Sequence, residues 1–197
     1  MVDLTPPQTI GPYFKSALSP DGEYPWPDAF SNNLVTPDVN GGRIRVEGKV
    51  FDGDGDVVLN SMLEIWQADG QGRFSDPRDE RALPNATFRG FGRCDTGNEG
   101  KFSFLTVKPG RVPGPNGKPQ APHILLAVHA RGMSRQEQTR IYFSDETAAN
   151  AADQILALVP AHRRETLIAR RDDTAQGAVY RFDIHLQGHL ETVFFDL

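Results

Sequence analysis

The feature that most constrains the fold is a succession of short strand-like segments separated by turn residues. Segment 43–52, RIRVEGKVFD, places Ile, Val, Gly and Val at every second position, which is the period of a strand with one buried face. The chain holds 19 Gly and 15 Pro among 197 residues, and this favours many turns over long helices. Further strands are expected within 57–68 and at 101–107, 123–130, 139–143, 178–187 and 191–195. The pattern predicts an all-β fold, a β-sandwich of mixed strands.

One segment has the period of a helix. Ser144 or Asp145 can cap it, and Pro160 ends it. Its apolar residues fall on one face: Ala148, Ala151, Ala152, Ile155, Leu156 and Val159. A second short helix is expected through 165–169. The sandwich should therefore carry one or two short helices.

Residues 1–42 lack periodicity and are rich in Pro, Gly and Asn, yet they include Tyr13, Phe14, Tyr24, Trp26 and Phe30. That aromatic content is too high for a solvated tail. We expect an extended N-terminal arm over 1–42 that packs on another chain or along its own body. One sandwich domain should follow over 43–197.

The charge balance is mildly acidic, with a net charge of −5. It predicts neither a nucleic acid nor an anionic membrane as partner, and no run of 18 apolar residues predicts a membrane span. The lone Cys94 excludes an intrachain disulfide framework and indicates a reducing compartment. The sequence therefore predicts a cytoplasmic protein.

Few side chains offer chemistry by their spacing alone. The DGDGD segment at 52–56 resembles the opening of a calcium loop, but Val57 stands where that loop needs Gly, so a hairpin turn is expected. His123 and His129 lie six apart on one expected strand, about 20 Å along it, and cannot alone grip one metal ion. Arg131 ends the same strand, where its guanidinium suits either a carboxylate ligand or a structural ion pair.

Segment 46–74, VEGKVFDGDGDVVLNSMLEIWQADGQGRF, resembles the signature region of the intradiol ring-cleavage dioxygenases. Further matches follow in order along the chain: GFGRCDT, FSFLTVKPG, QAPHI, ARGM, TRIYF, RRETLIA, YRFDIHLQG and ETVFFDL. A QT-x-GPY arm precedes them. The resemblance covers nearly the whole chain.

In that family a non-haem ferric iron is held by two Tyr and two His, ligands that suit Fe(III). The matching positions in this sequence are Phe74, Val112, His123 and Leu125. Phe74 lacks the phenol oxygen, Val112 lacks the ring, and Leu125 lacks any donor. The resemblance therefore implies that this chain binds no metal and contributes no catalytic residue of its own.

The resemblance also implies an iron-free subunit whose homologous partner, a beta chain, holds the Fe(III). The pair would cleave 3,4-dihydroxybenzoate with O2 to 3-carboxy-cis,cis-muconate. The substrate-binding positions carried over are Thr9, Gly11, Pro12 and Tyr13 of the arm, together with Arg131. Two alternatives stay open: a non-catalytic sandwich module that binds a small aromatic acid, and a self-sufficient enzyme whose metal site combines His123 with more distant residues.

Overall fold

The computed structural model describes residues 9, 11 and 31–196 of the chain. The strands are β1 (Arg43–Phe51), β2 (Met62–Trp66), β3 (Phe91–Asp95), β4 (Lys101–Val107), β5 (His123–His129), β6 (Glu137–Phe143), β7 (Ile168–Thr174), β8 (Gly177–Arg181) and β9 (Ile184–His185). The helices are α2 (Thr147–Ala152) and α3 (Gln154–Leu158), with 3₁₀ turns at Gly97–Glu99, Pro115–Gly117 and Ala161–Leu167. No helix among these residues is long and apolar enough to cross a membrane.

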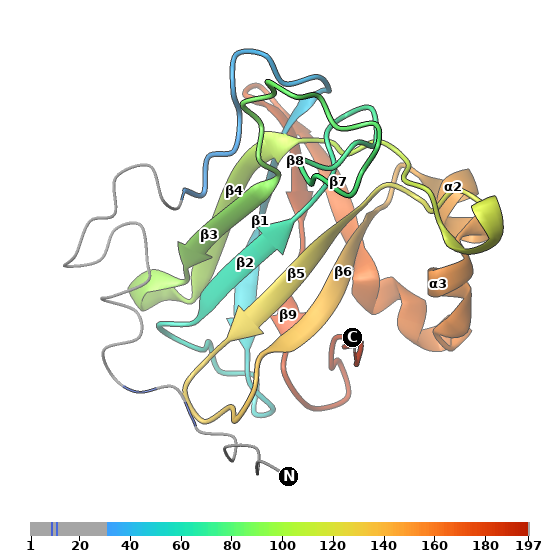
Figure 1. The fold of residues 1–197 in the computed structure, drawn as a ribbon. Helices are drawn as coiled ribbons and strands as arrows, with labels where there is room; N and C mark the ends of the chain where they lie inside the picture. The colour runs from blue at the N-terminus through green and yellow to red at the C-terminus, as the bar shows by residue number, and fades with distance from the viewer. Residues whose placement is uncertain (1–8, 10, 12–30, 197) are drawn as a thin grey trace, which may run out of the picture.

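The strands follow one another in the order β3-β2-β5-β6-β7-β8-β1-β4, and β9 pairs with β1. The path folds over at a short parallel pairing between β6 and β7, which joins Tyr142 to Ile168 and Phe143 to Ala169. Two layers result, with β3, β2, β5 and β6 in front of β1, β4, β7 and β8 (Figure 1). Parallel pairs of β1 with β8 and β9 accompany the antiparallel ones. The predicted β-sandwich of mixed strands is confirmed.

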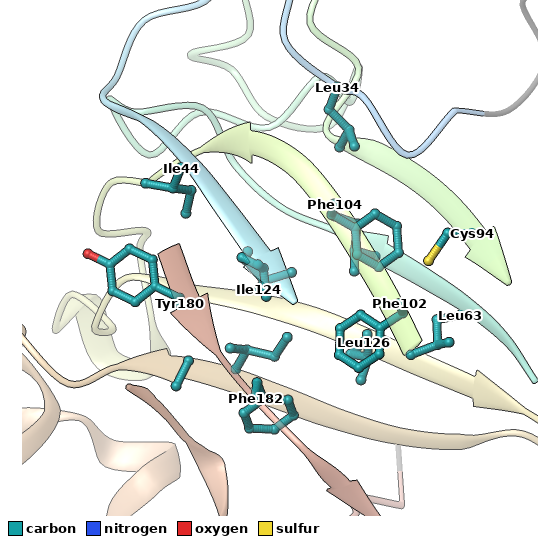
Figure 2. Packing of buried hydrophobic residues seen from close by; sticks show 14 of the residues in the cluster. Leu34, Ile44, Leu63, Cys94, Phe102, Phe104, Ile124, Leu126, Tyr180 and Phe182 are labelled. Carbon is teal, nitrogen blue, oxygen red and sulfur yellow. The ribbon is translucent and has the colours of Figure 1, made fainter. Parts of the chain in front are cut away.

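The core lies between the two layers because each strand turns alternate apolar side chains inward. Phe102 and Phe104 of β4 meet Leu63 of β2 and Ile124 and Leu126 of β5 there (Figure 2). All five side chains are at most 2% exposed. A second, smaller cluster packs the helices against the outer side of β6, and its buried members are Ala121, Tyr142, Leu156, Val159 and Leu167.

The segment preceding β1 is part of the folded body from residue 31 onward. Leu34 N donates to Leu105 O at 2.8 Å, and Leu105 N donates to Asn32 O at 2.8 Å. On the other side Arg93 N donates to Ser31 O at 3.0 Å. Segment 31–34 therefore bridges β3 and β4, the two ends of the strand path, and saturates edges that would otherwise stay unpaired.

Several expected elements differ from the structure. The single helix is two, because Asp153 has extended backbone between α2 and α3 and caps the second. The helix expected at 165–169 is the end of a 3₁₀ turn followed by β7. The strand expected at 191–195 is irregular, and the strand expected at 178–187 is divided between β8 and β9. Strands β3 and β7 were not expected.

Candidate functional site

The two loops that carry Phe74 and Val112 pack together at one end of the sandwich. Gly110 N donates to Asp69 O at 2.8 Å. Gly72 has a φ of +75°, and a Cβ there would collide with the Arg111 carbonyl oxygen, so this close approach requires glycine. The sequence signature around residues 69–74 thus serves the packing of two loops.

The carboxylate of Asp69 shapes the loop that leads to Phe74. Its Oδ1 accepts hydrogen bonds from Gln71 N and Arg73 N, each at 2.9 Å. Its Oδ2 accepts from Arg73 Nε at 2.9 Å and from Nη2 at 2.7 Å. Because all these partners lie within four residues, the loop is fixed locally and Phe74 follows at a defined place.

Phe74, the residue that the resemblance matches to the first Tyr ligand, lies in apolar surroundings. The ring of Phe74 stacks on Trp66 with centroids 6.1 Å apart and planes 4° apart. Trp66 is in register with Leu125 on the neighbouring strand β5, and Leu125 is the residue that the resemblance matches to the second His ligand. Val112 is 4% exposed. Three of the four residues that the resemblance matches to iron ligands therefore present only carbon atoms.

His123 is the one ligand-type residue among the four, and it is engaged within the chain. Its ring is 8% exposed, and Nδ1 lies 2.8 Å from the Ala121 carbonyl oxygen. Burial, and next the nearby Arg140 guanidinium, lowers the pKa of His123 from 6.5 to about 4. The imidazole is therefore neutral at pH 7, with Nδ1–H donating to Ala121.

These four residues do not fit a ferric ion. Three have no donor atom, and a lone imidazole supplies one ligand where Fe(III) needs several. No group of three or more His, Cys, Asp or Glu that could hold a metal occurs within residues 9, 11 and 31–196. The described part of the chain therefore offers no cluster of this kind for the alternative in which His123 combines with more distant residues.

Arg131 lies at the opposite end of β5. Arg131 is eight residue steps of largely extended chain from His123, which corresponds to roughly 25 Å. Arg131 is exposed, and its side chain makes no hydrogen bond or ion pair with any residue that the structure describes. It borders a groove of about 790 Å³ whose apolar lining includes Met133, Leu186 and Phe194. The guanidinium is therefore available to a ligand at this face.

The structure brings one arm residue to Arg131. Thr9 Oγ1 accepts a hydrogen bond of 2.9 Å from the backbone N–H of Gly132, 123 residues away in the sequence. Gly11 is exposed and has open space around it. Pro12 and Tyr13 lie outside the described residues. Of the five expected substrate-binding residues, Thr9 and Arg131 are thus placed on neighbouring backbone.

Sequence reasoning missed two residues that organise these ends of the fold. The backbone N–H of Gly132 binds Thr9 of the arm. The local sequence marks this residue only by an Arg-Gly pair at the end of a strand, which indicates a turn. Asp153 is 1% exposed and accepts from Ala121 N at 2.7 Å, which fixes the segment that carries His123. An Asp inside a helix-like pattern was the signal for a second helix start.

Comparisons with known proteins define first the class and then the family. The dioxygenase domain of a dioxygenase–carbohydrate-binding protein fusion from Streptomyces sp. SirexAA-E superposes with a TM-score of 0.59 at 26% identity, over 85% of this chain and 95% of that one. The fold is that of a ring-cleaving dioxygenase domain. A family model described as Dioxygenase matches residues 27–188. The chain belongs to the intradiol dioxygenase family, which depends on non-haem iron.

Two curated relatives refine this placement. The chain is 47% identical to the protocatechuate 3,4-dioxygenase alpha chain of Burkholderia cepacia over 197 residues, covering 98% of this chain and 97% of the relative. It is 36% identical to the beta chain of the same enzyme and organism over 169 residues, covering 82% of this chain and 71% of the relative. The similarity is therefore greater and more complete to the alpha chain.

Proposed function

We propose that this chain is the iron-free, alpha-type subunit of a protocatechuate 3,4-dioxygenase, an enzyme that cleaves 3,4-dihydroxybenzoate with O2 to 3-carboxy-cis,cis-muconate. One observation carries the proposal: Arg131 and the ligand-equivalent position His123 stand at opposite ends of β5, roughly 25 Å apart by strand rise. Arg131 therefore cannot serve a site at this chain's own ligand positions. It can serve a site on a second chain docked at its face.

The second chain in this proposal is a homologous beta chain that holds the Fe(III). The 47% identity to an alpha chain, over 98% of this sequence, supports the subunit over a free-standing binding module. The lack of donor atoms at Phe74, Val112 and Leu125 argues against the self-sufficient enzyme. The arm residues Gly11, Pro12 and Tyr13 would line the partner's pocket next to Arg131, and Thr9 would stand behind them on the turn that carries Arg131.

Arg131 is proposed to bind the ring carboxylate of the substrate. In 3,4-dihydroxybenzoate the carboxylate lies across the ring from the bond between the two hydroxylated carbons, so it needs a separate cationic anchor. A planar guanidinium meets both carboxylate oxygens at once, and its lack of a partner among the described residues leaves its donors free. Such a charge-assisted contact is worth about 1.5–3 kcal/mol.

Substitution Arg131→Ala in the reconstituted complex tests this role. The KM for 3,4-dihydroxybenzoate should rise about 10- to 100-fold. Unsubstituted catechol, which has no carboxylate, should be turned over as before. Arg170→Ala is the matched control, because Arg170 is a 77% exposed guanidinium that is paired with Glu165. Equal losses on both substrates, together with a lower melting temperature, would assign Arg131 to a structural role instead.

Iron quantitation tests the subunit assignment. The chain purified alone should bind no ferric iron and show no tyrosinate-to-iron colour. Co-expression with a beta chain should give a coloured, active complex that contains both polypeptides. Near one iron per chain in the isolated protein would contradict the proposal, as would tight binding of 3,4-dihydroxybenzoate by a chain that never pairs with a beta chain.

A further inference from the structure

The connection between β5 and β6 begins with a tight turn whose second residue is Arg131. Met133 N donates to Ala130 O at 3.3 Å, which closes a four-residue turn over 130–133. Gly132, in the third position, has a φ of +85°. That value is typical of the third residue of a type II turn, where glycine is favoured because it has no Cβ.

The Thr9 contact acts on one peptide unit of this turn. The closing hydrogen bond uses the N–H of Met133, so the N–H of Gly132 is left without a partner inside the turn. Thr9 Oγ1 accepts that N–H at 2.9 Å. The N–H belongs to the peptide that joins Arg131 to Gly132, and types I and II differ mainly by rotation of this peptide. Thr9 therefore holds the backbone torsion that directs Arg131.

We infer that Thr9 is a positioning residue for Arg131: its hydroxyl oxygen holds the Arg131–Gly132 peptide in one orientation, and so aims the guanidinium at the substrate carboxylate. The inference rests on the proposed function, since it assumes that Arg131 binds that carboxylate. It assigns Thr9 an action through the turn, whereas the resemblance implied a contact with substrate. The contact also couples the N-terminal arm to substrate affinity.

Thr9→Val in the reconstituted complex removes the acceptor at nearly constant volume. The KM for 3,4-dihydroxybenzoate should rise about 2- to 10-fold, the range expected for losing one hydrogen bond, with kcat little changed. Thr9→Ser, which keeps the oxygen, should restore the wild-type KM. Catechol should show no change. Thr174→Val is the control: Thr174 Oγ1 also accepts a backbone N–H, that of Gln176 at 3.2 Å, but it does so in the hairpin between β7 and β8.

The hairpin between β7 and β8, which contains the control residue Thr174, is remote from Arg131. Strands β6 and β7 run parallel, so the turn before β6 and the turn after β7 lie at opposite ends of the layer. Gly132→Ala gives an independent perturbation of the turn. A Cβ on Gly132 meets no atom within 4 Å, so alanine fits sterically but disfavours the positive φ. This variant should raise the same KM.

A double-mutant cycle separates the outcomes. In an Arg131→Ala background, Thr9→Val should cause no further rise in KM, because the group that it positions is gone. An additive rise, or an equal loss on catechol, would overturn the inference while leaving the proposed function intact. A normal KM for Thr9→Val beside a raised KM for Arg131→Ala would do the same. A normal KM for Arg131→Ala itself would refute the proposed carboxylate-binding role of Arg131, and this inference with it, while iron quantitation and pairing with a beta chain test the subunit assignment separately.

Discussion

Removal of Asp153 should cost much of the domain's stability, because this one buried carboxylate joins α3, β6 and the segment before β5. Oδ1 accepts from Ile155 N at 2.9 Å and Leu156 N at 2.8 Å, which caps α3, and from the Tyr142 hydroxyl at 3.2 Å. Oδ2 accepts from Ala121 N at 2.7 Å. The residue is 1% exposed, so solvent does not replace these bonds when the carboxylate is lost.

The magnitude for Asp153→Ala follows from these contacts. Losing the cap costs about 1 kcal/mol. The Ala121 N–H becomes a buried donor without an acceptor, at about 1–3 kcal/mol, and the Tyr142 hydroxyl adds about 1 kcal/mol. The free energy of unfolding should therefore fall by about 3–5 kcal/mol. For a domain of this size that corresponds to a melting temperature lower by roughly 6–20 °C.

Urea unfolding followed by circular dichroism measures the effect on the full chain. Asp153→Asn keeps one oxygen but replaces the other with a donor, so it should lose about half as much. Asp172→Ala is the matched control, since Asp172 is 52% exposed and its ion pair with Arg181 spans 3.3 Å. It should change stability by less than about 0.5 kcal/mol. If Asp153→Ala destabilises no more than the control, the reasoning about buried acceptors is wrong.

Three other predictions can be checked with the same protein. Folding lowers the pKa of His123 from 6.5 to about 4, so the stability that the neutral imidazole contributes is complete above pH 6.5 and is lost as the pH falls toward 4. His123→Asn should therefore flatten the plot of unfolding free energy against pH over this range. An unchanged plot would contradict the conclusion that His123 is buried in its neutral form. Lys108 Nζ lies 2.7 Å from both Asp145 and Glu146, so Lys108→Met should lower the unfolding free energy by about 1–3 kcal/mol, less in high salt; a neutral effect would show that the pairs add nothing. Deleting residues 1–30 should prevent stable pairing with a beta chain in size-exclusion chromatography, and a truncated complex with full activity would refute the proposed role of the arm.

The strands that alternation predicts well are those whose burial is set by their own residues. In β1, Ile44, Val46 and Val50 are at most 4% exposed, as their spacing indicates. Strand β3 gives no such signal, because its partner is remote: Leu34 fills the space beside Gly92, where a Cβ would collide with it. A strand that is completed by a distant side chain cannot be recognised from its own sequence.

Polar strands and false strands have related causes. The β7 sequence IARRDDT is largely exposed and is held by antiparallel pairing with β8, including Asp172 opposite Val179, so no apolar period marks it. The stretch 191–195 alternates but is divided between two neighbours. Thr192 N donates to His185 O at 2.9 Å, and Phe195 N donates to Gln138 O at 2.8 Å. Alternating apolar residues indicate which side chains are buried, whereas a strand forms only where the backbone pairs continuously with one neighbouring strand.

The candidate site likewise has features that can be predicted from single positions of the sequence and others that depend on contacts between distant segments. The expectation that Phe74, Val112 and Leu125 match iron-ligand positions comes from comparing single positions with the family pattern, and the structure adds that Phe74 stacks on Trp66. The contact of Thr9 with Gly132 spans 123 residues and leaves no mark in either local sequence.

That contact also bears on why Arg131 stands where it does. Ordering a long cationic side chain beside a groove costs rotamer entropy, and no residue among those described returns an ion pair for it. The turn that carries it has a glycine at a φ of +85°, and the N–H of that glycine donates a hydrogen bond to Thr9 of the distant arm. Neither feature is needed to pack this sandwich, whose core lies between the layers. Both are accounted for if the guanidinium is aimed at an anionic ligand held by another chain, which is the arrangement that the Arg131 and Thr9 variants test.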